Sequence, residues 1–318
     1  MTTRRNWLQG ATRAAGLLAF APRTAFSTAP AAGNTALITR AIPASGERLP
    51  IIGLGSSATF AQVARSEDAT ALGEVLQRML ALGGTVFDTA PAYGASEEVA
   101  GRIAQQLGIA DRLFWATKLN VARGGSADPA AARQQLEASF ERLGRPVIDL
   151  IQVHNMGDLR TQLPLLREMK DKGRVRYIGV TTTFERQYDD LLATMRSEPI
   201  DFIGTNYAID DRDAEQRFLP LARDRGIAVL VYAPFGRTRL WRRVANRQVP
   251  DWAQEFGATS WAQFFLKYVA SHPAVTTITP ATSRVVNMSD NMGAAVGPLP
   301  DDAQRKRMIA LVESLPAA

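Results

Sequence analysis

Short apolar runs and amphipathic segments alternate along this chain from about residue 36 onward, and this alternation constrains the fold more than any other feature. Helical patterns, several of which end at glycine, lie between the runs, for example over 67–83, 128–144 and 161–173. Near-continuous apolar runs indicate strands that are buried on both faces, and hence parallel strands covered by helices. The runs occupy residues 49–55, 85–90, 112–118, 148–155, 175–181, 200–207, 227–234 and 275–280.

Eight strands with about eight intervening helices predict an α/β fold of the (β/α)8 TIM-barrel type. The 318 residues are enough for one such domain. Residues 37–52, with a Ser-Gly-Glu turn, predict an N-terminal β-hairpin that closes the bottom of the barrel, and residues 300–315 predict a C-terminal helix.

Residues 53–58 fit the G-x-G-x-x-A pattern of dinucleotide-binding sheets, which is the main competing interpretation. That motif requires a helix to open at the glycines and an acidic residue about 20 positions further on. We expect the segment 59–66 to delay the helix, and Asp88 follows Gly55 at too great a distance. The pattern therefore does not predict a doubly wound sheet.

The first 31 residues have the organisation of an export signal. An arginine pair precedes an aromatic residue and a leucine, then a short apolar stretch over 14–21 and the small residues Ala29-Pro30-Ala31. The segment "TRRNWLQ" resembles the twin-arginine motif, although Trp7 and Gln9 depart from its usual form. We expect residues 1–31 to be a signal peptide, residues 32–318 to be the barrel, and the protein to reach the periplasm or exterior through the twin-arginine machinery. The alternative is an accidental arginine pair.

Composition excludes several classes of function. Four of the six net positive charges are arginines of the first 32 residues, which leaves about +2, too little for binding nucleic acid. No later segment has the pattern of a transmembrane helix, so an integral membrane protein is not expected. The chain has no cysteine, as suits an oxidising compartment, and its two histidines, His154 and His272, do not form a metal-binding pair. We expect no catalytic metal.

Four side chains with complementary chemistry follow neighbouring strands: Asp88, Tyr93, Lys118 and His154. Each alone has a structural interpretation, such as a turn contact, a solvated strand end or a rim histidine. In a (β/α)8 barrel, however, the active site lies at the carboxyl ends of the strands. An aspartate that fixes an ammonium group beside a phenol should lower the phenol pKa from about 10. Tyr93 could then protonate a carbonyl oxygen, with neutral His154 as a second donor, while the carbonyl carbon receives hydride.

These motifs resemble those of the aldo-keto reductase family. The segments "FDTAPAYG", "ATK", "IDLIQVHN", "GRVRYIGVT", "VLVYAPFG" and "ITPATS" occur in that order, and the resemblance extends from about residue 38 to the C-terminus. It implies that Asp88, Tyr93, Lys118 and His154 form a catalytic tetrad with Tyr93 as the general acid. It also implies a nicotinamide dinucleotide, usually NADPH, bound across the mouth of the barrel.

The resemblance also implies candidate cofactor contacts. Asn206 and the Thr181-Thr182 pair would hold the carboxamide, Tyr232 would stack on the nicotinamide, and residues 233–237 would follow the pyrophosphate. The full set comprises Gly55, Ser56, Asp88, Thr181, Thr182, Asn206, Tyr232, Ala233, Phe235, Arg237, Thr282, Ser283, Arg284, Asn287, Asp290 and Asn291.

The chain departs from the family pattern at three positions in these segments. Thr182 replaces the usual asparagine, Ala281 replaces glycine or lysine, and Asn287 stands where many members bind the 2′-phosphate with arginine. Arg284 could supply that contact, because a guanidinium group suits phosphate. We expect NADPH, with NADH left open.

The sequence thus predicts an NAD(P)H-dependent oxidoreductase that reduces an aldehyde or ketone to an alcohol. Because free NADPH is not expected outside the cytoplasm, the alternative is an exported cofactor-binding regulatory or scaffold protein with little turnover. The segment 234–260 carries five arginines and is either a solvated helix face or a lid over cofactor phosphates or an anionic substrate. The loop that follows His154 is short, which favours an open pocket.

Overall fold

The computed structural model of the protein describes residues 36–57, 59–65, 70–122 and 125–316. The compact unit that contains them runs from Asn34 to Ala318. The predicted signal peptide, residues 1–31, lies outside the described residues.

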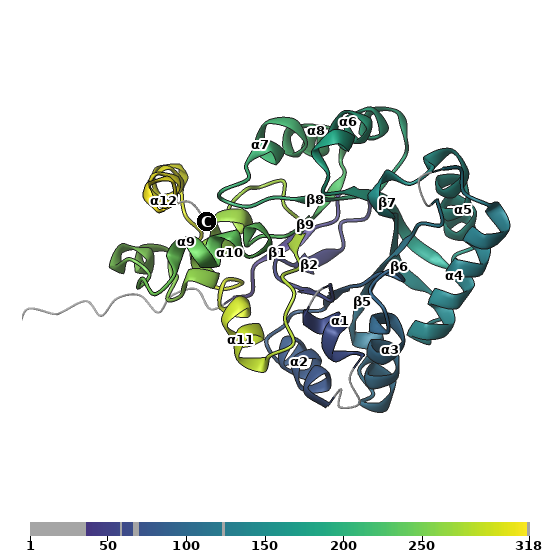
Figure 1. Cartoon of the computed structure of the whole chain (residues 1–318), viewed down its shortest axis with the longest axis horizontal. Coiled ribbons are helices and arrows are strands. Elements are labelled where there is room, and N and C mark those ends of the chain that lie inside the picture. The colour runs from purple at the N-terminus through teal and green to yellow at the C-terminus, as the bar shows by residue number, and fades with distance from the viewer. Residues whose placement is uncertain (1–35, 58, 66–69, 123–124, 317–318) are drawn as a thin grey trace, which may run out of the picture. The chain divides into compact units, whose positions relative to one another are not determined.

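The barrel is built from eight parallel strands that pair in chain order (Figure 1). Backbone bonds from Gly53 N to Ile278 O (2.8 Å) and from Gly55 N to Pro280 O (3.1 Å) join the first strand region to the last and close the ring. The predicted (β/α)8 barrel is confirmed. The strands are β3 Leu54–Gly55, β4 Val86–Asp88, β5 Phe114–Leu119, β6 Ile148–Val153, β7 Val175–Thr182, β8 Phe202–Asn206, β9 Ala228–Tyr232 and β10 Thr277–Ile278.

Helices surround the strands, as Figure 1 shows. Most carry apolar residues at helical spacing on the face toward the strands, for example Leu72, Val75, Leu76 and Met79. The helices are α1 Thr59–Val63, α2 Thr70–Ala81, α3 Ser96–Gln106, α4 Pro129–Leu143, α5 Leu159–Asp171, α6 Tyr188–Ser197, α7 Asp213–Arg217, α8 Leu219–Arg225, α9 Arg239–Val244, α10 Trp261–Ala270, α11 Val285–Gly293 and α12 Asp302–Ser314. Short 3-10 turns are η1 Ala110–Arg112, η2 His154–Met156, η3 Glu185–Gln187, η4 Gly236–Thr238 and η5 Asp251–Phe256.

Two expectations for local structure have different outcomes. The C-terminal helix is confirmed as α12, which begins at a capping box formed by Asp301 and Gln304. The delay expected over 59–66 is wrong, because α1 begins at Thr59, close behind the glycines. The interpretation against a doubly wound sheet still holds, since β3 belongs to the eight-stranded barrel. No helix within the described ranges is long and apolar enough to cross a membrane.

The predicted hairpin is present and closes one end of the barrel. Strands β1 Thr39–Ala41 and β2 Arg48–Pro50 pair antiparallel. Ile42, directly after β1, and Leu49, within β2, belong to the apolar cluster that fills the barrel together with Val86 and Phe114 at the starts of β4 and β5. The opposite end of the barrel, at the carboxyl ends of the strands, is where functional sites lie in this fold.

The interior changes from apolar to polar along the strands. Leu150 and Leu230 belong to the apolar filling. Because side chains alternate with a period of two, the residue two positions later on each strand points to the same interior. Those positions hold Gln152 and Tyr232, and by the same step Val86 leads to Asp88. A polar layer therefore lies above the apolar one, at the carboxyl ends of the strands.

Candidate active site

Asp88 and Lys118 form an ion pair inside the polar layer. Lys118 Nζ, on β5, donates to both carboxylate oxygens of Asp88, on β4, at 2.9 Å, and to the carbonyl oxygen of Thr89 at 2.7 Å. The exposed fraction is 3% for Asp88 and 2% for Lys118. Burial raises the pKa of Asp88 and the ammonium opposes it. Burial alone would lower the pKa of Lys118, but Asp88 and Tyr93 raise it above its ordinary value, so the ammonium stays charged.

Tyr93 lies in the turn between β4 and α3, where its backbone N–H donates to Ala90 O at 2.9 Å. Lys118 Nζ lies 5.2 Å from the centre of its ring. The expected lowering of the Tyr93 pKa is wrong: burial raises it, and the opposing effect of Lys118 is smaller. The physical reason is that burial removes a phenolate from water, and the free energy this costs exceeds the favourable interaction of the phenolate with one ammonium group. Tyr93 is therefore a protonated phenol at neutral pH, which suits a donor.

His154 is the first residue after β6, and its ring meets that of Tyr93 edge-on at 5.9 Å between centres. Asn120 Nδ2 donates to the carbonyl oxygen of His154 at 2.7 Å and fixes the backbone there. Burial, together with the charge of Lys118, lowers the pKa of His154 to about 3. The imidazole is neutral above that range, as expected from the sequence, so one ring nitrogen carries a proton that it can donate.

A cavity of about 910 Å³ opens at this end of the barrel and includes Asp88, Tyr93 and His154 in its wall. Lys118 lies just beneath, against Asp88. The cavity extends from there to the region 279–291. Most predicted cofactor residues also line it, and their contacts with a cofactor stay predictions. These are Gly55, Thr181, Tyr232, Ala233, Phe235, Arg237, Thr282, Ser283, Arg284, Asn287, Asp290 and Asn291.

The structure places three predicted cofactor residues away from the cavity. Ser56 is fully buried. The hydroxyl of Thr182 is bonded to Gln187 at 2.5 Å. The amide of Asn206 accepts from the Tyr188 hydroxyl at 2.8 Å and donates to Asp211. The side chains of Thr182 and Asn206 are engaged in internal hydrogen bonds, whereas the Ser56 hydroxyl is buried without a partner among the described residues. Strand alternation turns Thr181 toward the cavity and Thr182 away from it.

Several cavity residues were not predicted from the sequence. Ser57, Asn155, Thr183 and Phe184 follow strand ends, and a systematic reading of the two or three residues after each strand would have found them. Trp241, on α9, is 38% exposed and packs against Phe235 with ring centres 4.9 Å apart. Its helical position gave no strand-end signal.

The arginines of segment 234–260 that make side-chain bonds fall into two groups, one that lines the cavity and one that bonds to other parts of the protein. Arg237 reaches across the cavity mouth and donates to Thr183 Oγ1 at 2.6 Å. Arg239 instead pairs with Asp210 at 3.2 Å, and Arg243 donates to the carbonyl oxygen of Val312 at 2.5 Å. Ala233, Arg237 and Thr238 have φ of 50°, 51° and 83°. Non-glycine residues in this region of φ are strained, and such strain is concentrated at ligand-binding segments.

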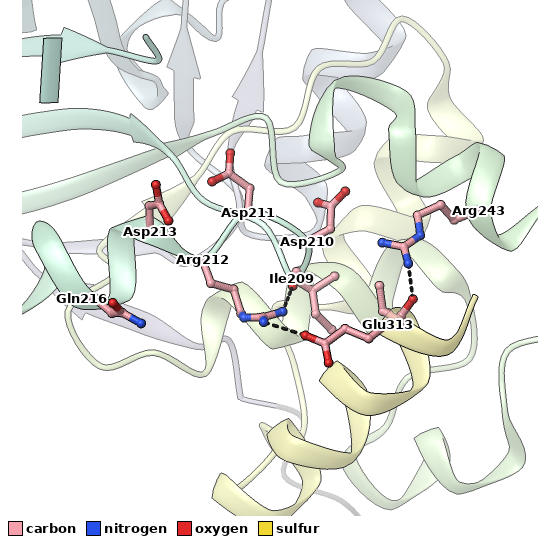
Figure 2. A pocket seen from close by; sticks show the side chains of 9 residues that line it. Ile209, Asp210, Asp211, Arg212, Asp213, Gln216, Arg243 and Glu313 are labelled. Atoms are coloured by element: carbon pink, nitrogen blue, oxygen red, sulfur yellow. Dashed lines mark hydrogen bonds and ion pairs between the residues drawn. The ribbon is translucent and has the colours of Figure 1, made fainter. Parts of the chain in front are cut away.

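A second cavity, of about 400 Å³, lies between the loop 209–213 and α12. Figure 2 shows Arg212 bonded to the carbonyl oxygen of Ile209 (2.8 Å) and paired with Glu313 (2.7 Å). Across it, Arg243 is bonded to the backbone of α12. These charges hold α12 in place. No metal-binding group of three or more His, Cys, Asp or Glu occurs in the part of the chain that the structure describes.

The barrel-mouth cavity suits an extended anionic ligand. Arg237 and Arg284 line it without a carboxylate partner among the described residues, and Asp290 is already bonded by Ser260 Oγ and Gln263 Nε2, each at 2.8 Å. The cavity ends at a protonated phenol, a neutral imidazole and a fixed ammonium, which together stabilise charge that develops on an oxygen. These groups lie at the carboxyl ends of the strands, where the active sites of (β/α)8 barrels are found.

Comparison with known proteins identifies the family. The model of the aldo/keto reductase family matches residues 51–308, and the chain belongs to this family. It is 32% identical over 196 residues to aldo-keto reductase YhdN of Bacillus subtilis, 58% of each chain. It is 30% identical over 177 residues to a probable aldo-keto reductase 1 of Glycine max, 51% of this chain and 49% of the relative. The matches thus span about half the length of these curated relatives.

Solved structures share the fold. One is an aldo-keto reductase from Klebsiella pneumoniae in complex with NADPH, with a TM-score of 0.71 and 22% identity over 87% of this chain and 96% of the other. Another is the holo form of AKR11C1 from Bacillus halodurans, with a TM-score of 0.69 and 22% identity over 89% and 98%.

Proposed function

We propose that this protein is an NADPH-dependent reductase that converts an aldehyde or ketone into an alcohol, with Tyr93 as the proton donor. The observation that carries the proposal is the cluster of Asp88, Lys118, Tyr93 and His154 at a cavity that is also lined by Arg237 and Arg284, neither of which has a carboxylate partner among the described residues. Family membership supports the same chemistry, and the related K. pneumoniae protein is in complex with NADPH.

The residues at the barrel mouth have distinct roles in this proposal. Bound NADPH would supply hydride to the carbonyl carbon. Tyr93 donates its phenolic proton to the carbonyl oxygen as negative charge develops there, and His154 donates a hydrogen bond to the same oxygen. Lys118 keeps the phenol in place and stabilises the phenolate after transfer, while Asp88 fixes Lys118. Because Tyr93 has a raised pKa, it is a hydrogen-bond donor before the reaction at every pH below the alkaline range.

Arg284 is our candidate for the 2′-phosphate. It is exposed, lines the cavity and has no side-chain partner among the described residues, while Asn287, one helical turn further on, carries no charge. A guanidinium group next to a cavity favours the doubly charged phosphate monoester that distinguishes NADPH from NADH. We therefore propose a preference for NADPH.

We also propose that residues 1–31 direct export by the twin-arginine route to the periplasm or exterior. The support is the sequence "TRRNWLQ" followed by a short apolar stretch and Ala29-Pro30-Ala31. Fractionation of cells that express the protein, with Arg4 and Arg5 both changed to lysine as the control, tests it. Equal export of both forms would contradict it.

A parallel titration with NADPH and NADH, followed by protein fluorescence, tests the proposed function. Trp241 lines the cavity and provides a signal. We expect tighter binding of NADPH than of NADH, and consumption of NADPH with a carbonyl panel. Tight binding without turnover, equal in wild type and Tyr93→Phe, would support instead a cofactor-binding regulatory protein. If neither nucleotide binds and denaturing the protein releases none, the proposal fails.

A further inference from the structure

The hydroxyl group of Tyr232 points into the barrel and reaches the catalytic ion pair. It lies 2.9 Å from Oε1 of Gln152 and 3.4 Å from Oδ1 of Asp88. Lys118 Nζ is 5.2 Å from the centre of the Tyr232 ring and 5.2 Å from that of the Tyr93 ring. The ammonium therefore lies between two tyrosines, and the hydroxyl of one contacts the carboxylate that holds it.

Two further strands are shaped to place this hydroxyl. Gln152, on β6, is fully buried, and its Nε2 is directed to Val180 O at 3.4 Å, which leaves Oε1 for the tyrosine. Gly204, on β8, leaves room for the ring, because a Cβ there would lie 2.5 Å from Cε2 of Tyr232. Leaving a buried amide oxygen without a hydrogen bond costs free energy, so Gln152 Oε1 favours the position of Tyr232 in which the hydroxyl donates to it.

We propose that Gln152 and Tyr232 are positioning residues for the Asp88–Lys118 pair, a role that goes beyond any stacking of Tyr232 on a nicotinamide. The proposal rests on the proposed function for its catalytic consequence. Gln152 Oε1 is the nearer acceptor and fixes the hydroxyl, whose one proton has Asp88 Oδ1 as a second and more distant acceptor. Asp88 in turn holds the ammonium that lies beside Tyr93. Tyr232, whose ring would lie against the nicotinamide, is in this way connected through Asp88 and Lys118 to Tyr93, the proposed proton donor.

Two substitutions separate the ring from its hydroxyl. Tyr232→Phe keeps the ring face, so we expect the Kd for NADPH to change less than about twofold while kcat falls about tenfold, as for one hydrogen bond to a charged group. Gln152→Leu keeps a similar volume and should lower kcat similarly. Because both act through one chain of contacts, the double variant should be no slower than Tyr232→Phe. Losses that multiply in the double variant would overturn the proposal.

A readout without turnover keeps this test separate from that of the proposed function. The chain has six tyrosines, so labelling with [13Cζ]tyrosine gives signals that single Tyr→Phe variants assign. We expect the Tyr93 signal of the cofactor-free protein to shift in Tyr232→Phe and in Gln152→Leu. Thr205→Val is the matched control: its hydroxyl is buried beside Gly204 and has no partner among the described residues, so the signal should not move.

The outcomes are distinct. An unmoved Tyr93 signal in Tyr232→Phe, or an equal shift in Thr205→Val, would overturn the positioning role. A coupled Tyr93 signal in a protein that neither binds NADPH nor reduces carbonyls would overturn the proposed function and support the positioning role.

Discussion

Replacing Lys118 by methionine should destabilise the protein strongly, and by an amount that depends on pH. The change keeps a long side chain but removes the ammonium that bonds both oxygens of Asp88 and the carbonyl of Thr89. Because the Asp88 side chain is almost fully buried, the variant retains an uncompensated carboxylate. Breaking such a pair costs about 3–5 kcal/mol of folding free energy. We expect a loss of this size at pH 7.5, measured as a lower urea midpoint.

The pH dependence follows from protonation of Asp88. Without Lys118, burial raises the pKa of Asp88 above the value of about 3.9 in the unfolded chain, and only the hydrogen bond from Tyr232 opposes it. The folded variant then binds more protons than the unfolded chain between those two pKa values, so its stability falls as pH rises through this window. The deficit relative to wild type should shrink by up to about 1.4 kcal/mol per pH unit on acidification toward pH 5.

Asp88→Asn combined with Lys118→Met serves as the control, because it removes both charges and should recover most of the loss while remaining inactive. A single variant within about 1 kcal/mol of wild type at pH 7.5 would refute the reasoning. So would a deficit that is constant from pH 5 to pH 7.5.

Three further outcomes follow from the site. His154 has a pKa of about 3, so kcat/KM should show no titration near pH 6.5; a step there would contradict a buried neutral imidazole. Arg284→Ala should raise the Kd for NADPH about tenfold and leave that for NADH unchanged in fluorescence titrations, whereas equal losses would remove its phosphate role. Gly204→Ala should displace Tyr232 and cost about 1–3 kcal/mol of stability in thermal unfolding; an unaffected melting temperature with full activity would show that the ring moves freely.

The barrel and the position of its site were predictable from the sequence because both depend on local periodicity. Parallel strands buried on both faces produce apolar runs, and the residues that follow them, such as Asp88 and Lys118, must meet at one end of the barrel. This holds whatever the helices outside do. The helix at 59–63 was missed because one short turn has little periodic signal.

Properties that depend on three-dimensional surroundings were not predictable in the same way. The direction of the Tyr93 pKa shift follows from the competition between burial, which raises the pKa, and the charge of Lys118, which lowers it. The sequence predicts the nearby charge but not the extent of burial. Thr182 and Asn206 were assigned by position along the chain. Strand alternation turns Thr182 away from the cavity toward Gln187, and the Asn206 amide is taken up by hydrogen bonds with Tyr188 and Asp211.

Gln152 illustrates a signal that was present in the sequence. It precedes His154 by two positions in a strand whose only other polar residue is Asp149, and a polar residue at an interior position needs a partner. Which partner it meets depends on Tyr232, which lies 80 positions further along the chain, and only the folded barrel reveals that contact.

The central claim, that Tyr93 protonates a carbonyl that receives hydride, is tested most directly by deuterium transfer. Wild type and Tyr93→Phe are each incubated with [4-2H]NADPH and a panel of aldehydes and ketones, and the alcohols are analysed by mass spectrometry. We expect wild type to yield alcohol that carries deuterium at the carbinol carbon, and Tyr93→Phe to bind NADPH equally well but react at least about 100-fold more slowly. Deuterium transfer at equal rates in both proteins would contradict the role of Tyr93, and no transfer by wild type to any carbonyl tested would contradict the reductase itself.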